Sequence, residues 1–363
     1  MTSTHTLSHI ALATIFLSFL AGCGDVTLLP FPSGSSERDT CSAVESCTVV
    51  TLADQRPGPS ALAVDTTHVY WVDRGGGGGT SAIVRELKAG GEVEVLATGQ
   101  GNVPSLALDQ THVYWTNLAG PDIDPSLVAV MRVPKEGGDA EALSPVQTNP
   151  WGLATAEGQV LWTNLPAGGA ATPTGEVWTM PASGGEAMLL ASGQKTPISL
   201  AVQGGTAYWL NGGSAPGEES AVLAANTSGG EAMTLAEGAF FPLGLSVDES
   251  SVYFTNTRTM EGMGNVMKVP VGGGDPAVVA EAQDHPSTVV RSGDHLFWTN
   301  AGSADAGSIG AVMKLGDKAD KPTVMVDGST LHPFGLAVDD AHVYWTDGPA
   351  GRVLRMDRCC PAK

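Results

Sequence analysis

The chain has few basic residues. Its 363 residues include 18 Lys and Arg against 38 Asp and Glu, which gives a formal net charge of −20. Phosphate backbones and anionic headgroups repel such a chain, so nucleic acid is not expected as a partner. The acidity fits the solubility of an exported protein, and it leaves open a cationic or metal-dependent ligand.

The N-terminal segment lacks both charge and a membrane-spanning length. Its first 23 residues contain no Lys, Arg, Asp or Glu, and the apolar stretch from Ile10 to Leu20 is too short to cross a bilayer. This pattern is typical of a signal peptide, although Lys and Arg are missing from its start. The stretch runs into Leu20-Ala21-Gly22-Cys23, which resembles a bacterial lipobox.

The lipobox resemblance implies that residues 1–22 are removed and that Cys23 is lipidated. Residues 23–46 are polar and include Ser33-Gly34-Ser35-Ser36, so they are predicted to form a flexible tether. We therefore expect an exported protein that is lipid-anchored in the bacterial cell envelope, at a periplasmic or outer-membrane surface. The lipid would be its only contact with the membrane.

Cysteine is also scarce, with five in the chain. Lipidation of Cys23 leaves an even set in an export context, where disulfides persist. Zinc is the alternative, but two adjacent cysteines do not give the spacing of a structural zinc site. Disulfides are favoured, and their candidates are Cys41, Cys47, Cys359 and Cys360.

One degenerate unit occurs seven times within residues 47–363. Its most regular part is a strand with a large aromatic at the fourth place and Asn or Asp at its end. The aromatics lie 44 to 47 residues apart, a period that fits a four-stranded blade. They are Trp71, Trp115, Trp162, Trp209, Phe254, Trp298 and Trp345.

The units predict an all-β fold, a seven-bladed β-propeller of four-stranded antiparallel blades. In each unit an apolar strand precedes the aromatic strand and a third strand follows it, with alternating polarity where it is clearest. In five units a Gly-Gly turn then leads to the fourth strand. The seventh unit lacks its fourth strand. Residues 48–52 are predicted to supply it, which would close the ring and bring the terminal cysteines together.

The repeat resembles that of the YWTD β-propellers of low-density lipoprotein receptors. The match is literal at Tyr344-Trp345-Thr346-Asp347, and it extends over roughly residues 48–360. Those modules have six blades and this chain has seven units, so the similarity is one of repeat. It implies binding rather than chemistry.

The repeated polar residues are interpreted as parts of the fold. Equivalent positions in different blades are spread around a ring, too far apart to share a metal. Short polar side chains at strand ends commonly bond their own turns. The residues concerned are the histidines His68, His112, His295 and His342 and the strand-end residues Asp73, Asn117, Asn164, Asn211, Asn256, Asn300 and Asp347.

Unrepeated residues are the better site candidates. His285 and His332 precede the prolines that begin two adjacent blades, and imidazoles can act as acids or bases. With Trp151, Phe240 and Phe334 they define a predicted ligand face near the channel mouth. We expect a scaffold that binds a protein or glycan. The alternative is a propeller enzyme of lactonase or lyase type with a divalent metal. No catalytic residue, metal ligand or cofactor is assigned.

Overall fold

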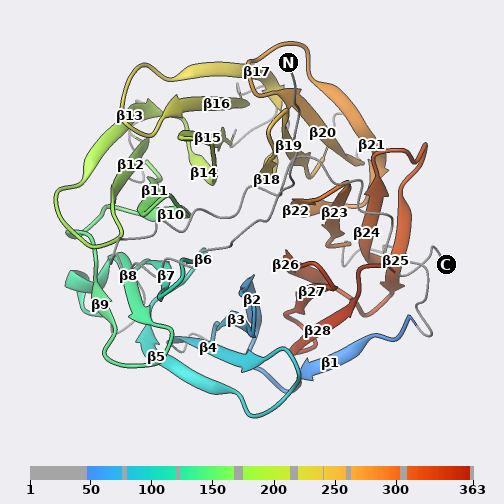
Figure 1. The fold of residues 1–363 in the computed structure, drawn as a ribbon, viewed down its shortest axis with the longest axis horizontal. Coiled ribbons are helices and arrows are strands. Elements are labelled where there is room, and N and C mark those ends of the chain that lie inside the picture. Colours follow the sequence, from blue (N-terminus) through green and yellow to red (C-terminus); the bar gives the residue numbers. More distant parts are fainter. Residues whose placement is uncertain are drawn as a thin grey trace, which may run out of the picture.

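The computed structural model describes residues 47–75, 80–119, 123–166, 175–212, 220–239, 241–258, 263–302 and 309–359. Seven four-stranded sheets surround a central axis, which confirms the predicted seven-bladed β-propeller (Figure 1). The predicted signal peptide and tether lie outside the described residues, as do Cys23, Cys41, Cys360 and Phe240. None of the described helices is long and apolar enough to cross a membrane.

Each blade runs from an inner strand to a rim strand, with antiparallel neighbours. Blade 1 consists of β2 (Pro59–Val64), β3 (His68–Asp73), β4 (Ser81–Leu87) and β5 (Glu94–Gln100), and blade 2 of β6 (Leu106–Leu108), β7 (His112–Asn117), β8 (Ala129–Pro134) and β9 (Glu141–Ala142). Blade 3 consists of β10 (Pro150–Ala156), β11 (Gln159–Asn164), β12 (Gly175–Pro181) and β13 (Met188–Gln194), and blade 4 of β14 (Pro197–Gln203), β15 (Thr206–Asn211), β16 (Ser220–Asn226) and β17 (Met233–Ala239). Blade 5 consists of β18 (Pro242–Val247), β19 (Ser251–Asn256), β20 (Gly264–Pro270) and β21 (Ala277–Gln283), blade 6 of β22 (Pro286–Ser292), β23 (His295–Asn300), β24 (Gly310–Gly316) and β25 (Thr323–Gly328), and blade 7 of β26 (Pro333–Val338), β27 (His342–Asp347) and β28 (Arg352–Asp357). A short 3-10 helix, η2 (Pro125–Leu127), precedes β8.

The N-terminal strand completes blade 7. β1 (Val50–Ala53) pairs antiparallel with β28, with Val50 opposite Arg355 and Thr51 opposite Leu354. The observed strand begins two residues later than the predicted 48–52, and its register shifts after Thr51. Cys47 precedes β1 and Cys359 follows β28, so both cysteines belong to the segments that meet at the closure.

The core lies between neighbouring blades. The large aromatic side chain in the second strand of each blade is almost fully buried, from Trp71 in β3 to Trp345 in β27. Trp115 packs with Tyr70 and Val72 of the preceding blade, and the other interfaces repeat this arrangement. Replacing such a tryptophan by alanine costs about 3–5 kcal/mol in most cores. The repeated aromatic motif of the sequence thus supplies the side chains that pack between neighbouring blades.

The threonine of the Tyr-Trp-Thr-Asp motif joins adjacent inner strands. Thr346 Oγ1 accepts from the backbone N–H of Gly335 in its own blade and donates to the Ser60 carbonyl of blade 1, at 2.9 Å in each case. A Cβ at Gly335 would lie 2.4 Å from that carbonyl, so the glycine allows the blades to approach. Thr255 makes the equivalent pair of bonds between blades 5 and 6.

Candidate functional site

The propeller has two chemically different faces. Because neighbouring strands are antiparallel, the loops after the second strands lie on the same face as the segments that enter each inner strand. We call this the loop face, and it carries Trp151, His285, His332 and Phe334. The opposite face, called the turn face, carries the hairpin turns that follow the inner strands, such as Asp65–Thr67.

Phe334 is the most exposed of the predicted ligand residues that the structure describes. It is the second residue of β26, 39% of its surface is exposed, and the guanidinium carbon of Arg74 lies 5.7 Å from its ring centroid. Arg74 follows β3, so the pair crosses the boundary between blades 7 and 1. Trp151 holds the equivalent place in β10 but is half-buried, and it lies in blade 3. The structure therefore separates the two predicted aromatics.

His285 has partners that the sequence did not reveal. Its Nδ1 lies 2.8 Å from Asp284 Oδ1, and Arg258 Nε lies 3.4 Å from its Nε2. Its φ of +53° is unusual for a side chain of this size. Thr196 and Phe241, which also precede the first proline of a blade, have φ of +53° and +49°. The backbone strain therefore belongs to the repeated entry turn and does not mark a catalytic residue.

His332 is held in the entry segment of blade 7. Its backbone N–H lies 3.4 Å from Asp347 Oδ1. Its Nδ1 is buried and has no hydrogen-bond partner among the described residues. Within those residues no hydrogen bond joins His332 to His285. The structure thus places the two imidazoles in adjacent entry segments, each in its own environment.

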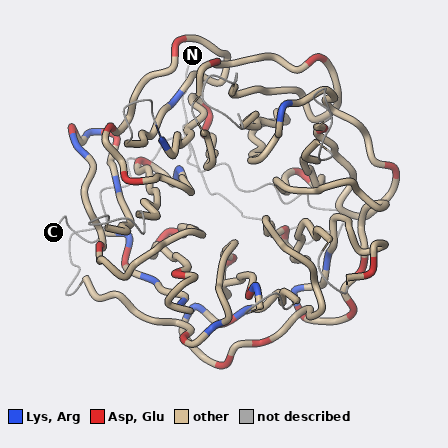
Figure 2. The backbone as a smooth tube through the Cα atoms, turned by 180° about the vertical axis from the view of Figure 1, so that it is seen from behind, with Lys and Arg blue, Asp and Glu red and all other residues tan. Residues whose placement is uncertain are grey.

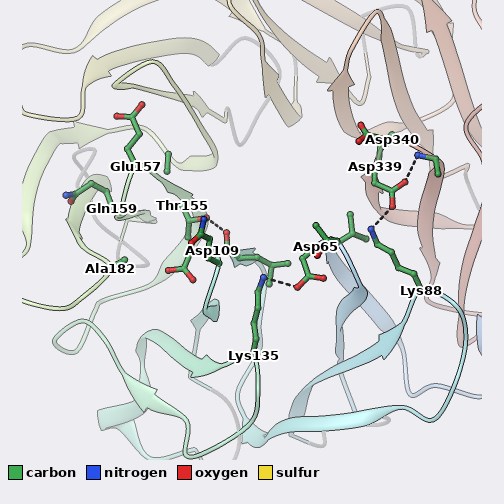
Figure 3. Close-up of a pocket in the computed structure, with 18 residues that line it drawn as sticks. Asp65, Lys88, Asp109, Lys135, Thr155, Glu157, Gln159, Ala182, Asp339 and Asp340 are labelled. Carbon is green, nitrogen blue, oxygen red and sulfur yellow. Dashed lines mark hydrogen bonds and ion pairs between the residues drawn. The ribbon is translucent and has the colours of Figure 1, made fainter. Parts of the chain in front are cut away.

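The turn face contains a cavity that the sequence reasoning missed. It has a volume of about 740 Å³ and is lined by the inner hairpin turns of blades 7, 1, 2 and 3, together with residues that follow the third strands (Figure 3). Its charged residues are Asp65, Lys88, Asp109, Lys135, Glu157, Asp339 and Asp340. Two sequence features could have indicated this cavity: the repeated Asp that follows the inner strand, and the Lys that follows the third strand in blades 1 and 2.

A repeated aspartate organises the turns of this face. Asp65 Oδ1 accepts the backbone N–H groups of Thr67 and His68 at 2.9 and 2.8 Å. Its Oδ2 accepts the hydroxyl of Tyr70 at 2.8 Å. The same three bonds recur at Asp109, Asp248 and Asp339. Each aspartate therefore closes its turn with one oxygen and binds a buried tyrosine with the other.

Cations from the following blade bind three of these aspartates. Lys135 Nζ lies 2.9 Å from Asp65 Oδ2, and Lys88 Nζ lies 2.5 Å from Asp339 Oδ2 (Figure 3). Arg291 Nε lies 3.0 Å from Asp248 Oδ2. Burial alone would raise the pKa of Asp339, but the Lys88 ammonium and the turn N–H groups outweigh it and lower that pKa.

The described residues contain no group of three or more His, Cys, Asp or Glu side chains placed to hold a metal ion. The recurring histidines instead contact their own turns. His68 Nδ1 and His112 Nδ1 each lie 2.8 Å from the hydroxyl of the preceding threonine. Their repetition therefore reflects turn structure.

No protein-family model and no curated protein matches the chain. Solved structures with the same fold include three of interest. A catalytically inactive virginiamycin B lyase from Staphylococcus aureus, with quinupristin, is 12% identical, covers 86% of this chain and 99% of its own, and has a TM-score of 0.62. A gluconolactonase from Xanthomonas campestris is 14% identical, with coverages of 86% and 90% and a TM-score of 0.53. The nidogen/laminin complex is 17% identical, with coverages of 72% and 92% and a TM-score of 0.51, and its nidogen is a YWTD-type propeller. These similarities establish the β-propeller fold.

Proposed function

We propose that this protein is a binding propeller of the bacterial cell envelope that recognises a protein or glycan partner with its loop face. The observation that carries the proposal is the Phe334–Arg74 pair, an exposed aromatic ring beside a guanidinium at a blade boundary. Aromatic rings stack on sugars and anchor protein interfaces, and arginine is enriched with them at such interfaces. A rigid scaffold that presents variable loops is a common arrangement for binding.

The attachment to the envelope is part of the same proposal. Lipidation at Cys23 would leave residues 23–46 as a tether leading to β1, which lies at the rim of blade 7 (Figure 1). An acidic domain would itself be repelled by anionic headgroups. The lipid would therefore hold the propeller near the membrane while the polar tether lets its loop face point outward.

We also propose a disulfide across the ring closure. Cys47 lies three residues before β1, and Cys359 lies two residues after β28, the strand with which β1 pairs. A disulfide between a cysteine before β1 and a cysteine after β28 would close a loop that contains most of the domain. In the chain-entropy model, closing such a long loop stabilises the folded state strongly.

The test of binding compares the protein with its Phe334→Ala and Arg74→Ala variants on immobilised envelope polysaccharides and in cross-linking to envelope proteins. Met188→Ala is the matched control, because Met188 is also 39% exposed but lies on a rim strand. We expect the two loop-face variants to lose at least tenfold in affinity for the captured partner while the control binds normally. Equal binding by all four proteins would contradict the assignment to this face.

A propeller enzyme of lactonase or lyase type is the second candidate. The observation that favours it is the contact of His285 with Asp284, which can orient an imidazole as a general base. Lactone and streptogramin substrates should be assayed with metal supplementation, using His285→Ala and His332→Ala as variants. Turnover that the His285→Ala substitution abolishes would support the enzyme, and no turnover by the unmodified protein would dismiss it.

A further inference from the structure

The repeated aspartate turns provide an internal comparison on the turn face. In blades 1, 5 and 7 the Oδ2 atom of the turn aspartate binds both a tyrosine hydroxyl and a cation. Asp109 of blade 2 makes the same turn bonds, and its Oδ2 accepts the Tyr114 hydroxyl at 2.6 Å. Among the described residues no Lys or Arg forms an ion pair with Asp109, which is partly exposed.

The missing cation has a sequence cause. Lys88 and Lys135 each follow the third strand of their blade directly and reach back to the preceding blade. The equivalent residue of blade 3 is Ala182, which follows β12. The blade boundary itself is intact, because Arg132 donates to the Ala182 carbonyl at 2.6 Å, as Arg85 does to the Lys135 carbonyl. The change therefore removes the ammonium group and leaves the backbone arrangement in place.

The place of the missing lysine belongs to the cavity. Asp109 and Ala182 both line it, and Figure 3 shows them with Thr155 at the blade 2 and blade 3 side of the cavity. Five carboxylates and two ammonium groups line the whole cavity, and the two ammonium groups are already bound to Asp65 and Asp339. The apolar ends of the inner strands complete the wall, through Val64, Leu108 and Val338.

The charge of the surrounding blades also favours a cation on the blade 3 side of the cavity. Blades 3 and 4, over residues 150–239, contain Lys195 as their one basic residue in the sequence, against several glutamates. Figure 2 shows Lys and Arg distributed over the rest of the ring. A cation is therefore attracted to the side of the cavity on which Asp109 lies.

We propose that this cavity binds a small primary amine, whose ammonium group occupies at Asp109 the position that Lys88 and Lys135 fill at their own aspartates. The apolar wall fits an aliphatic or aromatic body on the amine, and the cavity volume lies within the usual range of small-molecule sites. This site lies on the turn face, so its test is independent of the function proposed for the loop face.

The probe for the test is n-hexylammonium, with n-hexanol as the neutral compound of the same length, measured by titration calorimetry at low salt. The proposal expects hexylammonium to bind at least tenfold more tightly than hexanol. Asp109→Asn should remove that preference, and Ala182→Lys should compete through its own ammonium and weaken binding at least tenfold. Asp248→Asn, which breaks the corresponding pair outside the cavity, should leave binding unchanged.

Two results would overturn the assignment of the cavity to an ammonium group. One is equal binding of the ammonium and the alcohol by the unmodified protein. The other is undiminished binding by folded Ala182→Lys protein, with folding checked by circular dichroism. A lysine-containing peptide that bound more tightly than hexylammonium would overturn the assignment to a small free amine, because it would identify a protein side chain as the source of the ammonium group.

Discussion

Trp298 donates its indole N–H to Gln283 Oε1 over 2.9 Å, across the boundary between blades 6 and 5. The same glutamine accepts from Asn300 Nδ2 at 3.0 Å. Gln147 and Gln194 make the same pair of bonds to the tryptophan and asparagine of the next blade. One glutamine thus satisfies two buried donors at each of these boundaries.

Replacing Gln283 by alanine is expected to lower the free energy of unfolding by about 2 kcal/mol, because both donors would be left buried without their acceptor. Urea unfolding followed by tryptophan fluorescence measures the change. The chain offers a natural control: Ala239 holds this strand position in blade 4, and the next blade has Phe254, whose side chain has no N–H donor. Ala239→Gln should therefore give no gain in stability, and a gain would contradict this account.

Acid should destabilise the propeller through its turn aspartates. The folded-state pKa of Asp339 lies below its ordinary value of 3.8, so the folded protein binds fewer protons than the unfolded chain. The contribution of this group is complete well above pH 3.8 and is lost as the pH falls through and below that value. Asp339→Asn should be less stable than the unmodified protein at pH 7 and should lose less stability on acidification. Thermal unfolding between pH 7 and pH 3 measures both effects, and parallel curves for the two proteins would exclude Asp339 as a contributor.

Cys23→Ser is expected to release the protein from the membrane fraction. The substitution removes the thiol that lipidation requires, while the propeller begins more than twenty residues later and should fold unchanged. Fractionation of cells, with intact-mass measurement of the membrane-bound form, provides the readout. A membrane fraction that still contained all of the Cys23→Ser protein would show that another feature anchors the chain.

Peptide mapping without reduction is expected to link the N-terminal cysteines to the C-terminal pair. Cys47→Ser should then lower the free energy of unfolding by about 2–5 kcal/mol, the usual effect of losing a disulfide that closes a long loop. Addition of a reductant should lower the stability of the unmodified protein by at least as much, and it should lower the stability of the variant by less. Linkage of Cys359 directly to Cys360 would refute the proposed closure, although the paired strands β1 and β28 would remain.

The second strands could be predicted to the residue because they carry the pattern most completely. His68–Asp73 and its six equivalents are strands with the expected bounds, since burial on both sides fixes every position. The role of the glutamines could not be predicted, because they lie outside the repeated second-strand motif. Gln147, Gln194 and Gln283 nevertheless share a position, three residues before the proline of the next blade. Their role depends on a contact with another blade.

The cavity could not be predicted for a related reason. Its wall combines turns from four blades, and its distinctive feature is one absent lysine at Ala182. A sequence repeat shows what the units share. This cavity instead depends on Ala182, a departure in blade 3, which lies beside the repeated aspartate turn of blade 2. The described candidate ligand residues do lie on one face, the loop face, but their contacts with Asp284, Arg258 and Arg74 could not be predicted from the sequence.

The pairing of β1 with β28 also determines the order in which the ring can be completed. A chain made from its N-terminus produces β1 first, but its partner β28 follows roughly 300 residues later, and contacts of such separation form slowly. The six blades between them can fold from local hairpins while β1 remains an unpaired edge strand. The pairing of β1 with β28 is therefore the last strand pairing that can form during synthesis, and until then β1 presents an unpaired edge to other chains.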